Sequence, residues 1–328
     1  MYKSFFGITR NPFDLTPDPA CFVPTNRHNE ALAALYYGVR NHKGVIVVTG
    51  EVGTGKTLLL RCLLRLFRES KDIAYAYLFN CKLSPSELLY YTLADFGLSV
   101  SDSNKGKMLL DLSKHVTSRG LAGQTTVLII DEAHHLSADL LEEIRLLSNL
   151  ETNDEKLLQI VLVGQPELDE KLDSRELRQL KQRVALRAHL GSLTPVEVKW
   201  YIEERLRIAG RDPKAGNPFP DETIRAVYRY SNGLPRLINT LCENALITCY
   251  ARSLSTVRAD VIGEIARDFH MAESDSEIGE EDLTVRLDTD SSNNLLLELY
   301  SKLQRNLPDL NGIEMQDATE VSDHEPNL

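Results

Sequence analysis

The sequence predicts an α/β protein in which a parallel sheet carries helices on both faces and is followed by a small all-α domain and an acidic tail. Between residues 44 and 192, short apolar runs rich in β-branched residues alternate with helical patterns, as in parallel sheets whose strands are buried on both sides. Residues 193–270 contain only helical patterns, and residues 271–328 are acidic and rich in Ser and Asn. We therefore expect two folded domains and a disordered tail.

The composition is that of an ordinary soluble globular chain. Hydrophobic residues make up 42% and charged residues 26% of the 328 residues, which excludes a collagen-like, wholly disordered or disulfide-scaffold protein. The five cysteines have neither CxxC nor His/Cys metal spacing, so we expect reduced thiols in the core.

The sequence shows no signal-peptide pattern and no apolar run of membrane-spanning length, which predicts a cytoplasmic protein without an integral membrane segment.

The formal net charge of −11 comes from the tail. Residues 271–328 hold 15 acids against 3 Lys and Arg, whereas the first 270 residues hold 33 acids and 34 bases. The charge therefore neither excludes nor supports a DNA-binding face.

Within the tail, Leu296, Tyr300, Leu303 and Leu307 fall on one helical face. We expect a marginal, unbound helix there rather than a partner-docking peptide.

Residues 1–43 are expected to form an extended strap followed by a helix. Pro12, Pro17 and Pro19 fix φ and remove backbone donors, which favours an extended chain. A helical pattern then runs from about residue 26 to residue 41.

The α/β region, residues 44–192, contains strand and helix patterns in alternation. The expected strands are 45–49, 73–79, 126–130 and 158–163. The expected helices are about 56–70, one that starts at Ser84, 105–119, 137–150 and 175–181. Ser84 and Glu87 form a capping box with Pro85 at the first helical position, which marks that helix start.

The all-α region, residues 193–270, opens on a second capping box, formed by Thr194 and Glu197. Its expected helices are 196–209, 221–230, 235–250 and 258–269. No strand pattern of weight interrupts them, so we expect a small helical domain.

Residues 50–57, GEVGTGKT, match the pattern GxxxxGK[ST] of a phosphate-binding loop. The match follows a buried-strand pattern and precedes a helix, which is the context that the motif requires. Backbone N–H groups and the helix N-terminus would face the β-phosphate, Lys56 would contact the β- and γ-phosphates, and the Thr57 hydroxyl would bind Mg²⁺. The expected nucleotide-binding residues here are Gly50, Glu51, Val52, Gly53, Thr54, Gly55, Lys56, Thr57 and Leu58.

Two carboxylates, Asp131 and Glu132, follow the apolar strand pattern at 126–130. They would lie at the carboxyl end of a strand, where ligands bind in open α/β sheets. We expect Asp131 to hold Mg²⁺ through water and Glu132 to orient and deprotonate the attacking water as a general base. The pair therefore predicts hydrolysis of the bound nucleotide.

Two further polar residues are placed to contact the nucleotide. Gln165 follows the strand pattern at 158–163, at the level where a γ-phosphate or its attacking water would lie. A turn-forming Gly-Gln-Pro sequence would also explain it. Arg236 lies near the start of the helix expected at 235–250, where a cation is unfavourable unless an anion joins it. The nucleotide phosphate is the anion that we expect.

His134 and His135 are adjacent in the sequence. We expect their side chains to diverge, and no Cys or carboxylate cluster completes a tetrahedral site around them. We therefore interpret them as loop or helix-entry residues rather than metal ligands.

Taken together, these motifs resemble those of an AAA+ ATPase. More narrowly, the segments 2–7, 11–13, 163–168 and 232–239 are similar to those of the general secretion pathway protein A group. This group also takes in pilus-associated and exosortase-associated ATPases and is related to transposition ATPases. The resemblance covers roughly residues 1–270. It implies a P-loop fold with a parallel five-stranded sheet, a helical lid domain, and ATP and Mg²⁺ as ligands.

The resemblance also implies a ring or filament of identical subunits with ATP between them. Arg183 matches best the family's arginine finger, a catalytic side chain that acts on the ATP of a neighbouring subunit. Arg178 and Arg187 are the other candidates.

The function that the resemblance implies is ATP hydrolysis coupled to remodelling or assembly of a protein partner in secretion, pilus or exopolysaccharide and envelope biogenesis. Such a protein would be cytoplasmic and would reach the inner membrane through its partner. The alternative is an ATP-dependent transposition regulator whose partner is duplex DNA. Secretion members carry a membrane span and a peptidoglycan-binding domain after the ATPase, and the acidic tail in their place argues against direct work on the cell wall.

Overall fold

The computed structural model describes residues 1–79, 81–100 and 104–274. The acidic tail and its amphipathic stretch, both predicted from the sequence, lie outside the described residues apart from 271–274. No helix within the described ranges is both long and apolar enough to cross a bilayer.

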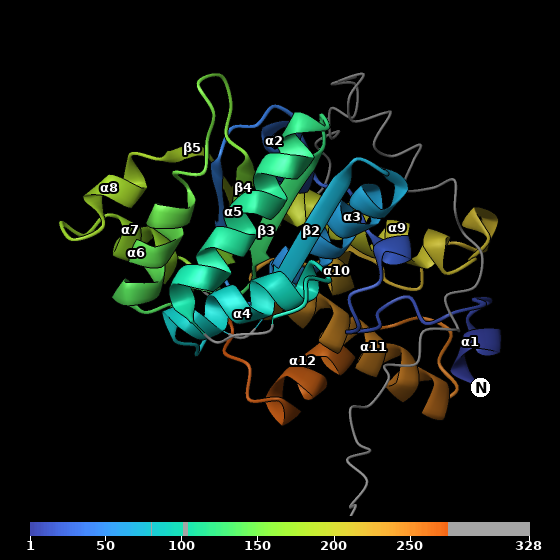
Figure 1. Cartoon of the computed structure of the whole chain (residues 1–328). Helices are drawn as coiled ribbons and strands as arrows, with labels where there is room; N and C mark the ends of the chain where they lie inside the picture. The colour runs from blue at the N-terminus through green and yellow to red at the C-terminus, as the bar shows by residue number, and fades with distance from the viewer. Residues whose placement is uncertain (80, 101–103, 275–328) are drawn as a thin grey trace, which may run out of the picture.

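A five-stranded parallel sheet forms the centre of the α/β domain, as predicted (Figure 1). The strands are β1 (Val45–Gly50), β2 (Ile73–Leu78), β3 (Thr125–Ile130), β4 (Leu158–Gly164) and β5 (Val184–Leu190). Their order in the sheet is β2-β3-β4-β1-β5. Every residue of β1, β3 and β4 is buried, because helices cover both faces.

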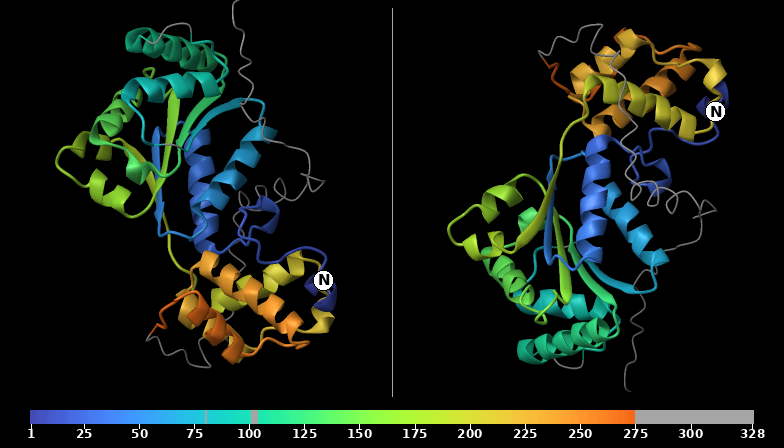
Figure 2. Two further views of the ribbon diagram at one scale, coloured as in Figure 1. Left: turned by 90° about the horizontal axis from the view of Figure 1, so that it is seen from below. Right: turned by 90° about the horizontal axis from the view of Figure 1, so that it is seen from above.

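Helices pack on both faces of this sheet (Figure 2). One face carries α2 (Asn26–Arg40) and α3 (Lys56–Glu69), whose leucines form a core with Ile46 and Val161. The other face carries α4 (Pro85–Asp95), α5 (Lys105–Leu121), α6 (Ala138–Leu147), α7 (Glu167–Leu172) and α8 (Arg178–Lys181). The capping box of Ser84 and Glu87 is formed at the start of α4.

Within the α/β domain, the sequence patterns missed the strand β5 and the helix α7. In strand β5, Val184, Leu186, Ala188 and Leu190 alternate with the more exposed Ala185, Arg187 and His189. The strand lies at the sheet edge beside β1 alone. That period-2 alternation was a usable signal, although the segment is less apolar than the central strands. The helix expected at 175–181 is shorter and starts at Arg178.

The lid domain contains α9 (Pro195–Ile208), α10 (Asp221–Ser231), α11 (Pro235–Ala251) and α12 (Ala259–Asp268), with a short 3₁₀ turn, η3 (Pro213–Ala215), after α9. The capping box of Thr194 and Glu197 starts α9. Just after β5, the start of the lid is held by a close backbone approach within the lid, in which Leu193 N donates to Gly233 O at 2.8 Å. A Cβ atom on Gly233, whose φ is +71°, would lie 2.0 Å from Leu193 O, so this contact requires glycine.

The N-terminal strap packs on the lid rather than standing apart, and both views of Figure 2 place it there. It is not wholly extended as expected, because it forms the short helix α1 (Tyr2–Phe5) and a 3₁₀ turn, η1 (Pro19–Cys21). Phe6, Ile8 and Phe13 belong to the same buried cluster as the lid helices. The buried guanidinium of Arg205 fastens the strap by donating to the carbonyl oxygens of Pro12, Asp14 and Cys21.

Candidate nucleotide site

The phosphate-binding loop connects β1 to α3 at the carboxyl edge of the sheet. Gly53 and Gly55 have φ of +85° and +98°. Residues with a side chain rarely adopt these angles, so the two glycines allow the loop to turn. Lys56 Nζ lies inside the loop and donates to the carbonyl oxygens of Gly50 and Glu51 at 2.7 and 2.9 Å. Burial lowers the pKa of Lys56, and the nearby Glu132 and Asp131 carboxylates oppose that shift.

His28, on α2, supports this loop from behind. Its Nε2 lies 2.9 Å from Thr54 O, and its Nδ1 lies 2.6 Å from the Thr25 hydroxyl. Burial lowers the pKa of His28, so its neutral form is favoured. A Cβ atom on Gly55 would lie 3.0 Å from His28 Nε2. Sequence reasoning missed His28, because it precedes the loop by more than twenty residues and belongs to no motif.

The two predicted magnesium ligands lie together. The Thr57 hydroxyl is 3.4 Å from Asp131 Oδ2, and the Tyr77 hydroxyl donates to the same carboxylate oxygen at 3.0 Å. Burial raises the pKa of Asp131, while the hydrogen bond from Tyr77 acts in the opposite direction. A hydroxyl and a carboxylate are hard oxygen donors of the kind that Mg²⁺ binds together with water and substrate phosphates, so this pair fits the ion. Tyr77, on β2, was not predicted from the sequence.

Glu132 and Gln165 approach the loop from the ends of β3 and β4. Glu132 has φ of +54°, an uncommon conformation for a residue with a side chain, and such conformations gather at functional sites. Its side chain is 43% exposed, and its Oε2 lies 3.4 Å from His134 Nδ1. Gln165 Nε2 lies 3.0 Å from His134 Nε2.

The expectation that His134 and His135 diverge was wrong. Both lie in the 3₁₀ turn η2 (Ala133–His135), so they are loop residues, but their ring centroids are only 3.9 Å apart. Successive side chains in a 3₁₀ turn are separated by about 120°, not by the 180° of a strand, so two long side chains can meet. With Glu132 they form a group whose ligand-type atoms lie within 4.8 Å of one another.

The lid closes the other side of the site through Arg236 in the first turn of α11. Arg236 N donates to Gly53 O at 3.2 Å, so the lid touches the phosphate-binding loop directly. A Cβ atom on Gly53 would lie 2.9 Å from Arg236 Cβ. The side chain of Arg236 is exposed and faces the same pocket as Lys56.

Most of the predicted nucleotide-binding residues line one pocket of about 330 Å³ between the α/β domain, the lid and the strap, but Gly50, Glu51, Thr54 and Asp131 are not part of its lining. Its lining includes Val52, Gly53, Gly55, Lys56, Thr57, Leu58, Glu132, Gln165, Tyr201, Arg205, Pro235, Arg236 and Asn239, together with residues 14–18. The strap's part in the site was not predicted, because residues 14–18 are joined to the pocket only by tertiary contacts such as Arg61 Nη1 donating to Pro17 O.

The predicted arginine finger lies far from this pocket. Arg183 immediately precedes Val184, which pairs with Val45, the first residue of β1, so Arg183 is at the amino-terminal edge of the sheet. There it lines a separate cavity with Gly44, Lys156 and Gln182. Arg187 pairs with Asp169 at 2.9 Å. The structure thus does not bring Arg183 to the nucleotide pocket of its own chain.

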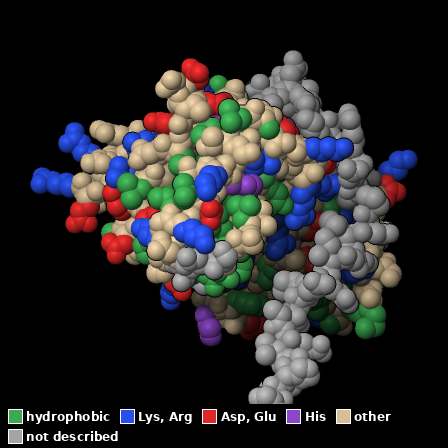
Figure 3. All heavy atoms as spheres, in the orientation of Figure 1, with side chains coloured by type: hydrophobic (Ala, Val, Ile, Leu, Met, Phe, Trp, Pro, Cys, Tyr) green, Lys and Arg blue, Asp and Glu red, His purple; other side chains and the backbone are tan. Residues whose placement is uncertain are grey.

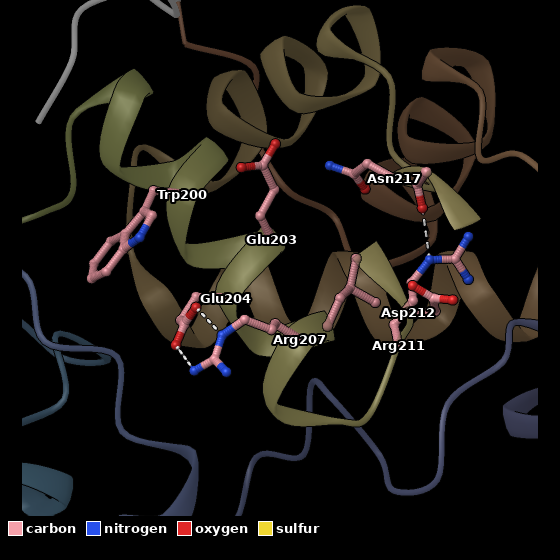
Figure 4. A pocket seen from close by; sticks show the side chains of 9 residues that line it. Trp200, Glu203, Glu204, Arg207, Arg211, Asp212 and Asn217 are labelled. Atoms are coloured by element: carbon pink, nitrogen blue, oxygen red, sulfur yellow. Dashed lines mark hydrogen bonds and ion pairs between the residues drawn. The ribbon is translucent and has the colours of Figure 1, made fainter. Parts of the chain in front are cut away.

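A second pocket, of about 390 Å³, lies in the lid beside α9 (Figure 4). Arg207 pairs with Glu204, and Arg211 donates to Gly216 O, so both cations already have protein partners. Glu203 and Asp212 add negative charge, which disfavours a phosphate ligand. This lid pocket is therefore a poorer candidate for a nucleotide than the pocket at the phosphate-binding loop.

Comparisons with known proteins identify a family and relatives for this chain. Residues 39–172 match the family described as AAA domain. The chain is 41% identical over 263 residues to general secretion pathway protein A of Aeromonas hydrophila, covering 80% of this chain and 47% of that protein. It is 25% identical over 187 residues to the ATP-dependent target DNA activator B of Escherichia phage Mu, covering 56% and 55%. The chain thus spans about half the length of the curated relatives that it matches.

Solved structures share the fold. The Aeropyrum pernix ORC2 protein, solved as ADPNP-ADP complexes, superposes with a TM-score of 0.58 at 17% identity, covering 84% of this chain and 75% of that one. At this level of identity the likeness shows the fold alone.

Proposed function

Because the chain belongs to the AAA+ ATPases of the general secretion pathway protein A group, we propose that it binds Mg-ATP between its α/β domain and its lid and hydrolyses the γ-phosphate. The observation that carries the proposal is the convergence of Lys56, Glu132, Gln165 and Arg236 on one pocket. These residues come from four separate segments of the chain, and each supplies a group that ATP hydrolysis requires.

Each side chain has a role in this proposal. Lys56 and the loop N–H groups neutralise and hold the phosphates. Thr57 and Asp131 would hold Mg²⁺, which would offset the charge of the phosphates. Glu132 accepts a proton from the attacking water, and its half-exposed position gives water access to it. The amide of Gln165 orients the γ-phosphate or the water, and Arg236 contacts phosphate from the lid side.

We further propose that subunits assemble with the pocket at their interface. Arg183 is at the opposite edge of the sheet from the pocket of its own chain, so it can complete only the pocket of a neighbour. A ring or a helical filament would satisfy this geometry, because both repeat one head-to-tail interface.

Hydrolysis would act on a partner through the lid. Arg236 joins the lid to the phosphate-binding loop, and the contact between Leu193 and Gly233 holds the chain that leaves β5 against the turn before α11, so a change at the γ-phosphate can alter the lid angle. We propose a protein partner in secretion, pilus or exopolysaccharide and envelope assembly, and the similarity to general secretion pathway protein A supports the first of these. We propose that the protein works in the cytoplasm and reaches the inner membrane through that partner.

Removing Lys56 tests the site. We expect Lys56→Ala to weaken ATP binding by roughly 10- to 150-fold, because hydrogen bonds to charged groups contribute about 1.5–3 kcal/mol. The measurement is a titration with ATP by calorimetry. Lys114→Ala, which removes an exposed lysine on α5, is the matched control and should bind normally. Unchanged ATP affinity in a folded Lys56→Ala protein would contradict the assignment of the loop.

A DNA-binding role in transposition is the second candidate, and the similarity to the phage Mu target DNA activator favours it. The face drawn in Figure 3 carries many Lys and Arg side chains mixed with acidic ones, so the surface charge does not decide the question. If DNA is the partner, the affinity for duplex DNA in the presence of ATP should fall steeply as the salt concentration rises. The logarithm of the binding constant should fall linearly with the logarithm of the salt concentration, because each contact with a DNA phosphate releases counterions. Fluorescence anisotropy titrations at salt concentrations from about 50 to 200 mM measure this dependence. If the protein shows no ATP-dependent binding to DNA even at the lowest salt concentration, the DNA-binding role is excluded.

A further inference from the structure

His134 lies between the two side chains that the proposed reaction needs next to the γ-phosphate. Its Nδ1 is 3.4 Å from Glu132 Oε2, and its Nε2 is 3.0 Å from the amide nitrogen of Gln165. The residue is only 8% exposed, whereas the carboxylate that it contacts is 43% exposed. One imidazole thus joins the ends of β3 and β4 at the site.

The turn that carries His134 is held firmly. Lys171, on α7, donates to the carbonyl oxygens of His134 and Leu136. A Cβ atom on Gly164 would lie 3.0 Å from His134 N, so the end of β4 presses against the turn. These contacts fix the backbone of His134 on both sides, so the position of its imidazole relative to Glu132 and Gln165 is restricted.

The neighbours of the ring decide where its proton lies. Burial, the adjacent His135 and Lys56 lower the pKa of His134, and a neutral imidazole has one donor and one acceptor nitrogen. The Glu132 carboxylate only accepts hydrogen bonds, so a proton on Nδ1 suits it. The backbone N–H of Gln165 also points to Nδ1, at the same 3.4 Å, and a proton on Nδ1 gives up that contact. The negative charge of the carboxylate, not the distance, favours the proton on Nδ1. Nε2 then accepts from the amide of Gln165.

We propose that His134 is a positioning residue that holds Glu132 and Gln165 in one fixed arrangement and thereby links contact with the γ-phosphate to orientation of the general base. This inference rests on the proposed ATPase function. The amide nitrogen of Gln165 has two N–H groups, so one can remain on His134 while the other donates to a phosphate oxygen or the attacking water. The Nδ1–H of His134 meanwhile holds one oxygen of Glu132 and leaves the other free to accept a proton.

His134→Ala is expected to lower kcat about 100-fold, since a misplacement of about 1 Å in an active site has effects of this size. The ATP dissociation constant should change less than about threefold, because Lys56 and the loop make the main phosphate contacts. His135→Ala is the comparison variant. It removes the ring that stacks on His134 but leaves the contacts of His134 with Glu132 and Gln165 in place, so it should lower kcat clearly less than His134→Ala does.

Two conservative variants separate positioning from a general effect on the fold. His134→Asn places an amide N–H near the position of Nδ1, so it should recover much of the loss by holding Glu132 again. Combining His134→Ala with Gln165→Ala should lower kcat by clearly less than the product of the two single losses, because both changes break the same connection. Steady-state ATPase assays and ATP titrations on all variants measure these effects.

The outcomes distinguish the two proposals. A folded wild-type protein without ATPase activity would overturn the proposed function. Wild-type activity that His134→Ala leaves unchanged would overturn only the inference about His134. Failure of His134→Asn to recover any activity, together with multiplicative losses in the double variant, would assign His134 a purely structural role. If His134→Ala does not fold, the comparison of His134→Asn with His135→Ala decides, and equal kcat losses in the two would reject the positioning role.

Discussion

Replacing Arg183 by Ala is expected to lower the rate of ATP hydrolysis by about 10³–10⁵-fold and to leave ATP binding nearly unchanged, since an arginine finger in P-loop enzymes stabilises charge that develops only during transfer. Arg183 is at the amino-terminal edge of the sheet, away from its own pocket, so the loss would appear at the site of a neighbouring subunit. Turnover per subunit of the wild-type protein should therefore rise with protein concentration as subunits associate.

A mixing experiment tests the action between subunits. Lys56→Ala retains Arg183 but has a defective pocket, and Arg183→Ala retains the pocket but lacks the arginine. Mixed assemblies should recover activity that neither variant shows alone. Mixing that restores nothing, with co-assembly verified by sedimentation, would mean that Arg183 acts in its own subunit or is structural.

The two other arginines provide the controls for this experiment. Arg187 pairs with Asp169, which also accepts a hydrogen bond from the Thr49 hydroxyl, so Arg187→Ala should affect this local network rather than a neighbour's ATP. Arg178, in α8, is exposed. A loss of activity by Arg178→Ala that mixing rescues would transfer the finger role to that residue.

Replacing Glu132 by Gln is expected to lower kcat by about 10²–10⁴-fold, because the amide keeps the shape of the carboxylate but loses its basicity. ATP should still bind, since the loop and Lys56 are unchanged, and the variant should therefore accumulate in the ATP-bound state. Single-turnover hydrolysis of radiolabelled ATP, with binding measured separately, provides the test.

Glu170→Gln is the matched control for Glu132→Gln. Glu170 lies on α7, close in sequence to Gln165 but outside the lining of the pocket, and it undergoes the same chemical change. Normal turnover by Glu132→Gln, or an equal loss by Glu170→Gln, would remove Glu132 from its role as the general base.

The phosphate-binding loop and the strands beside it could be predicted because their information is local. Residues 50–57 carry the loop pattern within eight consecutive positions, and the apolar runs of β1, β3 and β4 lie directly before the polar residues that they position. A parallel sheet then brings the carboxyl ends of these strands to one edge, so the approximate meeting of Lys56, Asp131 and Gln165 follows from the strand patterns. Strand β5 had a weaker local pattern and was missed.

Only the tertiary structure decided which further groups complete the site. His28 supports the loop from α2, Tyr77 donates to Asp131 from β2, and the strap residues 14–18 line the pocket after packing on the lid. The sequence patterns place His28 in a helix and Tyr77 in a strand but do not show what either side chain contacts, because each contact joins segments that are distant in the sequence. His134 was visible beside Glu132, but adjacency along the chain does not determine where two side chains point. The 3₁₀ turn and the contact with Gly164 turn its ring toward both Glu132 and Gln165, and such packing depends on the whole fold rather than on neighbouring residues.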